Sequence, residues 1–243
     1  MDIERFRCAL KTVLYSERSR ESIGTYSEGT LHAVLKNCYE SDFGRQELKV
    51  GKYIADIVGQ DGIIEIQTRQ LFKMKDKLRA FLTVSDVTVV YPVAVSRIIY
   101  WQNAETGEVS GKRKSPKHDN IFSAIEELYS LREFIDHPGF HFVALLISTE
   151  EYKYYKSNRF GKKINVRRID RIPTDIIAEE IFYSRSDYSR IIPDGLPERF
   201  TSLDFSTCAG IPRSQAQSSL AFLYYIGLVR REGREKSGYI YAL

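Results

Sequence analysis

Apolar residues recur at helical or strand spacing along most of this chain, and the alternation of the two patterns predicts an α/β protein. Spacings of three and four predict helices over residues 3–13, 28–38, 70–82 and 120–135, and another from Thr174 onward. Shorter apolar runs predict strands at 54–58, 62–68, 87–91 and 140–147, and a hairpin that starts at 98–101 and turns near 106–107. The strand at 87–91 is expected to end at Pro92, because proline cannot donate a ladder hydrogen bond.

Two carboxylates occupy the consecutive apolar strands at 54–58 and 62–68. The turn residues 59–62 join these strands, and a hairpin centred between residues 60 and 61 makes Asp56 face Glu65. Cross-strand neighbours have Cβ atoms roughly 5 Å apart, so two facing acids repel each other unless a positive charge compensates. A divalent cation with oxygen ligands would resolve the conflict. In the alternative interpretation the turn has another register, and both carboxylates lie at solvated strand edges.

A third acid, Glu28, precedes the strands in the sequence. Ser27 is a suitable N-cap, and Leu31, Leu35 and Cys38 follow at helical spacing, which places Glu28 in the first turn of the helix. Taken alone, an acid at this position is more typical of an interaction with the helix dipole than of a catalytic group. His32, one turn further on, is expected to be a partly buried helix residue.

A helix with Glu28, a strand with Asp56, a strand with Glu65-Ile66-Gln67 and a lysine-rich helix follow one another between residues 20 and 95. This order resembles the PD-(D/E)XK nuclease superfamily, which has the restriction-endonuclease and junction-resolvase fold. The resemblance implies an αβββαβ core with a mixed sheet. It also implies that Asp56, Glu65 and the main-chain carbonyl of Ile66 bind Mg²⁺ or Mn²⁺, with Glu28 as an outer acid.

The chain departs from the superfamily pattern at Gln67, where the pattern has lysine. Glutamine can orient a water molecule by hydrogen bonding, but it supplies no positive charge. Lys73, or a residue of the segment 151–171, is the expected source of the missing cation.

Positive charge is concentrated in two segments, although the net charge of the chain is only +4. Residues 112–117 contain four cations and no acid, and residues 151–171 contain eight cations, two acids and several tyrosines. Such a segment can bind phosphates by charge and stack aromatic rings on exposed bases. The candidate phosphate-binding residues are Lys73, Lys112, Arg113, Lys114, Lys162, Lys163, Arg167 and Arg168. In the alternative, 151–171 is a twisted hairpin whose tyrosines pack on the sheet and whose lysines protect an edge.

The last 45 residues predict a helix, a turn, a second helix and a hairpin, which is the order of a winged-helix domain. The first helix begins at Thr201 or Ser202, the second covers 213–226, and the hairpin joins 228–231 to 239–241. In the fold that this order resembles, the second helix commonly enters the major groove of DNA. The candidate DNA contacts are Arg213, Gln215 and Gln217, with Arg231 in the wing. The alternative is a protein-binding module.

These observations predict three parts: a nuclease-like domain at 1–185, a linker at 186–198 and the winged helix at 199–243. No apolar run approaches the about 20 residues that span a bilayer, the N-terminus is a charged amphipathic helix rather than a signal peptide, and the three cysteines suggest a reducing compartment. We therefore expect a cytoplasmic, metal-dependent nuclease that acts on nucleic acid, DNA more than RNA, with no membrane partner. A catalytically silent DNA-binding regulator, a winged-helix adaptor and a homodimer remain open.

Overall fold

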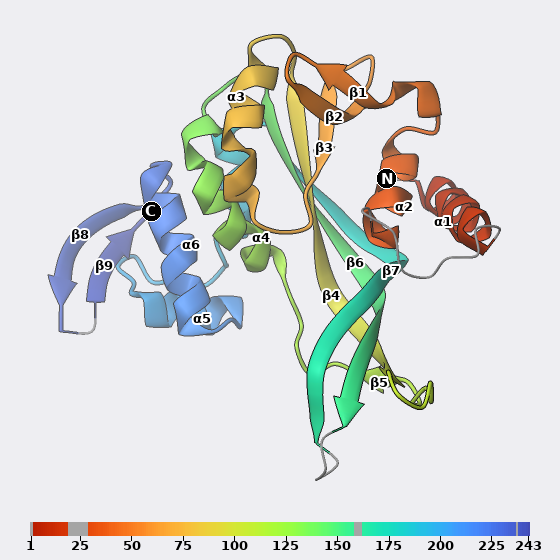
Figure 1. The fold of residues 1–243 in the computed structure, drawn as a ribbon. Coiled ribbons are helices and arrows are strands. Elements are labelled where there is room, and N and C mark those ends of the chain that lie inside the picture. Colours follow the sequence, from red (N-terminus) through yellow and green to blue (C-terminus); the bar gives the residue numbers. More distant parts are fainter. Residues whose placement is uncertain (1, 19–28, 158–161, 237) are drawn as a thin grey trace.

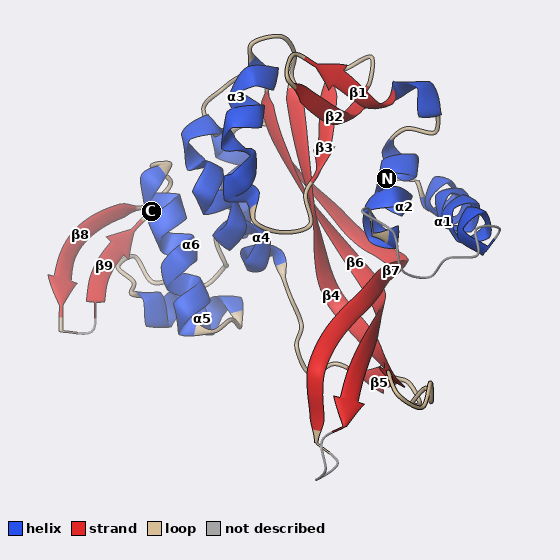
Figure 2. Ribbon diagram, in the orientation of Figure 1, coloured by secondary structure: helices blue, strands red, loops and turns tan. Residues whose placement is uncertain are grey.

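A curled, mixed β-sheet runs through the molecule, with helices on both of its faces (Figures 1 and 2). The computed structural model describes residues 2–18, 29–157, 162–236 and 238–243. The sheet order is β1-β2-β3-β4-β6-β7, with β5 beside β4; β3, β4 and β6 are parallel and the other pairs antiparallel. Its strands are β1 (Gln46–Val50), β2 (Tyr53–Val58), β3 (Ile63–Ile66), β4 (Val87–Asn103), β5 (Arg113–Lys114), β6 (Phe140–Ser157) and β7 (Lys163–Phe182).

The first half of the chain contains a helix, three strands, a second helix and a strand, in that order. The helices there and in the middle of the chain are α1 (Ile3–Arg18), α2 (Thr30–Tyr39), α3 (Lys75–Leu82) and α4 (Ile121–Leu128), with 3₁₀ turns at Phe43–Arg45, Leu71–Met74 and Tyr129–Phe134. The connection from β3 through α3 to β4 makes these two strands parallel, with Glu65 beside Val89. The α/β class is therefore established.

The turn between β2 and β3 has the predicted geometry. Val58 pairs with Ile63, and Gly59 N–H donates to the carbonyl of Gly62 at 2.9 Å. Gly62 has a φ of 125°, and a Cβ at this position would lie 2.6 Å from the carbonyl oxygen of Asp86. Glycine is required here both for the backbone angle and for the close approach of the β4 entry.

Separate groups of helices cover the two faces of the sheet. On one face, Leu31 and Leu35 of α2 pack against Ile57, Ile66 and other apolar strand residues, and α1 packs on the outer side of α2. On the other face, α3 and α4 contribute buried residues to the largest apolar cluster. The apolar stripes predicted for the α2 and α3 segments are therefore the buried faces of these helices.

Two predicted boundaries in the sheet are wrong. The strand predicted to end at Pro92 continues to Asn103, because β3 ends opposite Val90 and no ladder on that side then requires the N–H of Pro92. No helix begins at Thr174; the segment belongs to β7, which pairs with β6 over most of its length. Tertiary pairing decides between the two structures here, because the local apolar spacing suits either.

The C-terminal residues form the predicted sequence of two helices and a hairpin: α5 (Ser202–Ala209), α6 (Arg213–Tyr225), β8 (Arg230–Glu235) and β9 (Gly238–Ala242). Thr201 caps α5 in a capping box with Asp204, as the sequence indicates, and Gly210 ends the helix with a φ of 64°. Phe200 pairs with Tyr241 and so ties the entry of α5 to the hairpin.

The segment 186–198 is a packed part of the fold rather than the predicted spacer. It contains most of a 3₁₀ helix (Arg185–Ile191), and Tyr188 stacks on Phe182 with ring centroids 4.4 Å apart. Phe222 of α6 meets Tyr188 edge-on at 5.1 Å, and Phe205 of α5 meets Phe122 of α4 at 5.9 Å. The C-terminal elements thus share one apolar core with the rest of the molecule.

None of the helices in the described part of the chain is both long enough and apolar enough to cross a membrane.

Candidate functional site

The hairpin of β2 and β3 brings Asp56 and Glu65 together, as the sequence predicts. The N–H of Asp56 donates to Glu65 Oε1 at 3.1 Å, and the N–H of Ile66 donates to Asp56 Oδ2 at 2.8 Å. Each carboxylate therefore accepts a hydrogen bond from the main chain of the opposite strand. The interpretation that placed both acids at solvated edges is wrong, because Glu65 is only 3% exposed.

The two acids have opposite pKa shifts. Burial, followed by repulsion from Asp56, raises the pKa of Glu65 to about 7, against the opposing effect of Lys77. Burial also acts to raise the pKa of Asp56, but the hydrogen bond and charge of His32, the N–H of Ile66 and the charge of Lys77 together hold it below its usual value. Near neutral pH Asp56 is therefore ionised, and the pKa of Glu65 lies close to that pH.

The cation that contacts Glu65 is Lys77 of α3, which was not singled out from the sequence. Its Nζ donates to Glu65 Oε2 at 2.5 Å. The expected source, Lys73, is exposed in the preceding 3₁₀ turn and lies 6.0 Å from the ring of Phe72. The available signal for Lys77 was its spacing, because it precedes the fully buried Phe81 by one helical turn and so lies on the inner side of α3.

His32 is the second contact that the sequence did not assign to the site. Its Nε2 lies 3.2 Å from Asp56 Oδ2, and both side chains are mostly buried. The helix that carries His32 begins at Thr30 with Gly29 as N-cap, and Asp170 of β7 accepts a hydrogen bond from the N–H of Thr30 at 3.2 Å. The predicted cap and the outer acid, Ser27 and Glu28, lie outside the described residues.

Gln67, which stands where the superfamily pattern has lysine, bonds within the turn that follows β3. Its Nε2 donates to the carbonyl of Arg69 at 2.7 Å. This hydrogen bond shows that the Gln67 amide is occupied in shaping the turn.

The oxygen atoms around Asp56 and Glu65 suit a hard divalent cation. Two carboxylates from neighbouring strands and the carbonyl of Ile66 are the donors that Mg²⁺ and Mn²⁺ accept. Burial raises the pKa of Glu65 most, and the negative charge of Asp56 raises it further, so a cation would favour the ionised form of this carboxyl. Among the described residues, no group of three or more His, Cys, Asp or Glu side chains is arranged for a metal, so such an ion would depend on these two carboxylates.

A cleft of about 730 Å³ borders the carboxylate pair through His32. The walls of this basic cleft carry five cations and two acids: Arg69, Lys153, Arg167, Arg168 and Arg171, with Glu151 and Asp170. Thr68 and Arg69 lie two and three residues after the end of β3, so the cleft starts close to the end of the Glu65 strand. The predicted Arg167 and Arg168 line this cleft together with His32, which contacts Asp56.

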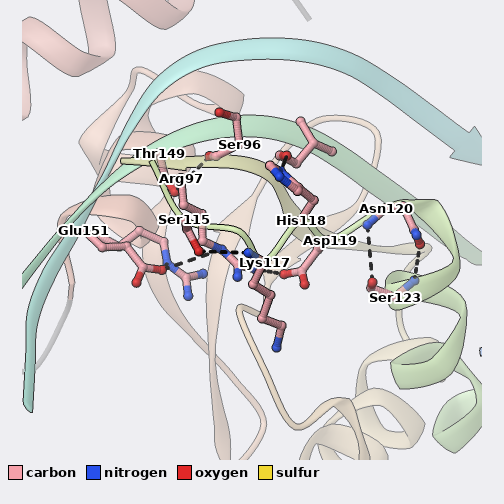
Figure 3. A network of polar contacts seen from close by, with 12 residues as sticks. Ser96, Arg97, Ser115, Lys117, His118, Asp119, Asn120, Ser123, Thr149 and Glu151 are labelled. Atoms are coloured by element: carbon pink, nitrogen blue, oxygen red, sulfur yellow. Dashed lines mark hydrogen bonds and ion pairs between the residues drawn. The ribbon is translucent and has the colours of Figure 1, made fainter. Parts of the chain in front are cut away.

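Glu151 is a buried carboxylate that holds the cations of this wall. It is 4% exposed, and Lys153 Nζ and Arg171 Nε lie 3.1 and 3.2 Å from its oxygens. Figure 3 shows the Arg97 side chain within reach of both Asp119 and Glu151.

A β-bulge between Ala94 and Ser96 changes which side chains of β4 point to each face of the sheet. The alternation of apolar and polar residues in the sequence cannot reveal this change.

The remaining predicted basic residues lie away from the cleft. Lys112, Arg113 and Lys114 are exposed in and beside β5, and Lys162 and Lys163 are exposed at the start of β7. All five lie at the far part of the long strands rather than beside Asp56 and Glu65.

The structure divides the candidates in the C-terminal helix. Gln215 is buried: its Oε1 accepts from Asn120 Nδ2 and its Nε2 donates to Ser123 Oγ, both at 3.1 Å. The prediction that Gln215 is exposed to DNA is therefore wrong, because α6 docks on α4 with this side. Arg213 and Gln217 are exposed.

Arg231, predicted to reach phosphate from the wing, is held between two tyrosines. Its guanidinium carbon lies 4.1 Å from the ring centroid of Tyr224 and 3.9 Å from that of Tyr239. The guanidinium group of Arg231 thus already makes cation–π contacts with both tyrosine rings.

We expect Gln215→Ala to lower the free energy of unfolding by about 1–3 kcal/mol, since it leaves Asn120 and Ser123 without their shared partner. Gln217→Ala is the matched control, because Gln217 is exposed two residues further on the same helix. Urea denaturation of both variants measures the difference. Equal stability of the two would show that the contact of α6 with α4 contributes nothing.

Comparison with known proteins places these features in a family. A family model described as "Domain of unknown function (DUF8091)" matches residues 29–183. The chain belongs to the DUF8091 family. It is also 29% identical over 213 residues to an "Uncharacterized protein" of Treponema pallidum (strain Nichols), an alignment that covers 87% of this chain and 81% of the relative. No solved structure matches.

The DUF8091 segment coincides with the sheet and the site. It begins at Gly29, the N-cap of α2, and ends just after β7. It includes Asp56, Glu65, Lys77 and the whole basic cleft, and it leaves out α1 and the C-terminal helices and hairpin. The family match therefore covers the whole sheet and all the residues that line the cleft.

Proposed function

We propose that this protein is a metal-dependent nuclease that hydrolyses phosphodiester bonds of DNA, with a PD-(D/E)XK-type centre at Asp56, Glu65 and Ile66. The observation that carries the proposal is a buried pair of facing carboxylates that contacts a lysine and borders a cleft lined with arginines. A carboxylate pair alone would fit many metal sites. Beside a basic cleft, its substrate is expected to be a phosphate ester.

Asp56, Glu65 and the carbonyl of Ile66 are the groups that would hold the divalent ion. Mg²⁺ or Mn²⁺ bound by such groups supplies a Lewis acid and lowers the pKa of a coordinated water. The pKa of Glu65 is about 7, and a cation bound beside it would favour the ionised form. His32 holds Asp56 by its Nε2 contact and fixes the direction of that carboxylate.

Lys77 supplies the positive charge that Gln67 lacks. Its ammonium group contacts Glu65 and comes from α3, so it approaches the carboxylates from a different element than the superfamily lysine would. A fixed positive charge here stabilises the negative charge that develops on the phosphate during attack. This assignment replaces Lys73 and the 151–171 segment as the source of the cation.

The basic cleft would hold the phosphates that flank the scissile bond. Arg167, Arg168 and Arg171 offer guanidinium groups, which bind phosphate oxygens through paired hydrogen bonds. Glu151 keeps Arg171 and Lys153 in place without cancelling the total charge, since it is one acid among several cations. The C-terminal elements are proposed to form a winged helix that contacts duplex DNA through Arg213 and Gln217.

A catalytically silent DNA-binding regulator is the second candidate, and a specific observation favours it. Lys77 occupies Glu65 Oε2 and His32 occupies Asp56 Oδ2, so the chain itself compensates both carboxylates. Such a protein would bind DNA through the same cleft and leave it intact. The adaptor function would instead use the exposed tyrosines and arginines of the C-terminal unit.

Incubation with supercoiled, single-stranded and branched DNA, and with RNA, tests the proposal. Each substrate is offered with Mg²⁺, with Mn²⁺ or with a chelator, and Glu65→Gln protein from the same purification controls for contaminating nucleases. Products that require metal and wild-type Glu65 support the nuclease. Salt-dependent binding without products supports the regulator, and absence of both leaves the adaptor.

Reversing the charge of Arg167 and Arg168 to glutamate should weaken binding to all DNA sequences together, because phosphate contacts carry no sequence information. Each lost contact should reduce the magnitude of the salt slope by roughly 0.7–0.9. Lys11→Glu/Lys49→Glu is the matched control, with the same charge change at two exposed sites outside the cleft. Fluorescence anisotropy at several salt concentrations measures both, and equal slopes would remove the cleft from the binding surface.

A further inference from the structure

The strands β4, β6 and β7 continue beyond the helices as a long arm (Figure 1). One face of this arm carries Trp101 and Tyr155. Trp101 pairs with Lys153 in the ladder and Asn103 with Tyr155, so the two rings are diagonal neighbours. They meet edge-on, with centroids 6.0 Å apart.

Lysine ammonium groups lie over these two rings. Lys163 Nζ lies 4.0 Å from the Trp101 centroid and 4.4 Å from that of Tyr155, and Lys153 Nζ lies 5.7 Å from Trp101. Burial and the charge of Arg113 lower the pKa of Lys163. Several positive groups therefore lie close together at one aromatic pair. An anionic ligand would reduce the repulsion between these groups.

On the opposite face of the arm, the aromatic residues pack against each other. Tyr100 and Tyr152 stack in parallel with centroids 5.0 Å apart, and both hydroxyls donate to Glu150. Their faces and their polar groups are satisfied by each other and by that acid. The rings of Trp101 and Tyr155 have no such arrangement, since lysine heads lie over them.

The aromatic face is continuous with the basic cleft. Lys153 lines the cleft and also lies over Trp101. The same cleft reaches His32, which contacts Asp56. A strand of nucleic acid bound at Asp56 and Glu65 can therefore follow a row of cations to the arm.

We propose that Trp101 and Tyr155 stack on the bases of a single-stranded DNA segment while Lys153, Lys163 and Arg113 bind its phosphates. Only an unpaired strand offers its base faces to protein rings, because a duplex stacks them on each other. The inference rests on the proposed function and names its substrate class: DNA that has a single-stranded segment beside the cleaved bond.

Trp101 is the only tryptophan of the chain, so its fluorescence reports on this face alone. Titration with a short oligodeoxythymidylate in the presence of a chelator should quench it saturably, and a duplex of the same length should bind more weakly. By anisotropy, Trp101→Leu should lower affinity for the single strand by about tenfold. Tyr100→Leu, on the opposite face, is the matched control and should change affinity by less than about twofold.

Lys163→Gln gives a second variant at an exposed position, in case Trp101→Leu fails to fold. It should reduce the magnitude of the salt slope by roughly 0.7. Absence of quenching, equal losses in the Trp101 and Tyr100 variants, or duplex binding as tight as single-strand binding would overturn the proposal. Tighter binding of an oligouridylate would overturn DNA as the ligand. The chelator prevents cleavage during this titration, so binding is measured independently of catalysis. Saturable quenching together with no cleavage in the separate metal-containing assay would support the single-strand surface and reject the nuclease function.

Discussion

The Glu65→Gln variant is expected to lose metal-dependent cleavage by about a hundredfold or more and to be more stable than wild type above pH 7. The loss follows from removing one of two carboxylates that would hold the ion, a change comparable to deleting a preorganised charge-stabilising group. The gain in stability has a separate origin in the metal-free protein. It follows from the pKa of Glu65, which is about 7 in the fold.

The sign of the stability change is fixed by proton binding. Between the ordinary glutamate pKa of 4.5 and about 7, the folded protein holds a proton on Glu65 that the unfolded chain has released. The free energy of unfolding therefore decreases as pH rises through this window, and the decrease is complete above pH 7. The shift corresponds to at most roughly 3 kcal/mol, and glutamine avoids this cost because it cannot ionise.

Thermal melting with a chelator at pH 5 and pH 8.5 measures the effect. Glu65→Gln should match wild type at pH 5 and exceed it at pH 8.5, with the gain reduced by the loss of the Lys77 contact. Glu105→Gln makes the same chemical change at an exposed position and should alter neither melting temperature. A lower melting temperature of Glu65→Gln at pH 8.5 would show that the lost Lys77 contact outweighs the cost of ionising Glu65 in the fold, and would contradict the prediction.

The facing acids could be found from sequence because a short turn fixes the register of a hairpin. Once residues 59–62 are recognised as the turn, Val58 is opposite Ile63 and Ile57 is opposite Ile64, and extending this register by one position places Asp56 opposite Glu65. The N-cap of α5 and the buried stripes of α2 and α3 could also be predicted from the sequence. Each depends on residues a few positions apart in the chain.

The contacts that complete the site depend on how distant elements dock. Lys77 reaches Glu65 only because α3 lies on that part of the sheet, and His32 reaches Asp56 only because α2 covers the other face. Gln215 looks exposed on a helical wheel, yet the surface of α4 buries it. The segment after Thr174 has apolar residues that suit a helix, and pairing with β6 makes it a strand.

The Lys77→Met variant is expected to lower cleavage by about 10²–10³-fold while leaving metal binding at pH 8.5 no weaker than in wild type. Methionine keeps an unbranched side chain beside Phe81, whose ring lies 5.5 Å from the ammonium group, so the packing of α3 is retained. The ammonium group contacts Glu65 Oε2, and a metal ion must compete with it for that oxygen. Its removal therefore frees a ligand at the same time as it removes the charge that would stabilise the attacked phosphate.

Lys73→Met separates this role from a general loss of positive charge. Lys73 lies one turn earlier, is exposed beside Phe72 and should tolerate the change with cleavage altered by less than about twofold. Calorimetric titration with Mn²⁺ and single-turnover cleavage, measured on the same preparations, give the two quantities independently. If both lysine variants cleave as wild type does, Lys77 serves only to neutralise Glu65 in the metal-free fold. If Lys77→Met loses metal binding together with cleavage, the lysine positions the carboxylate rather than the phosphate.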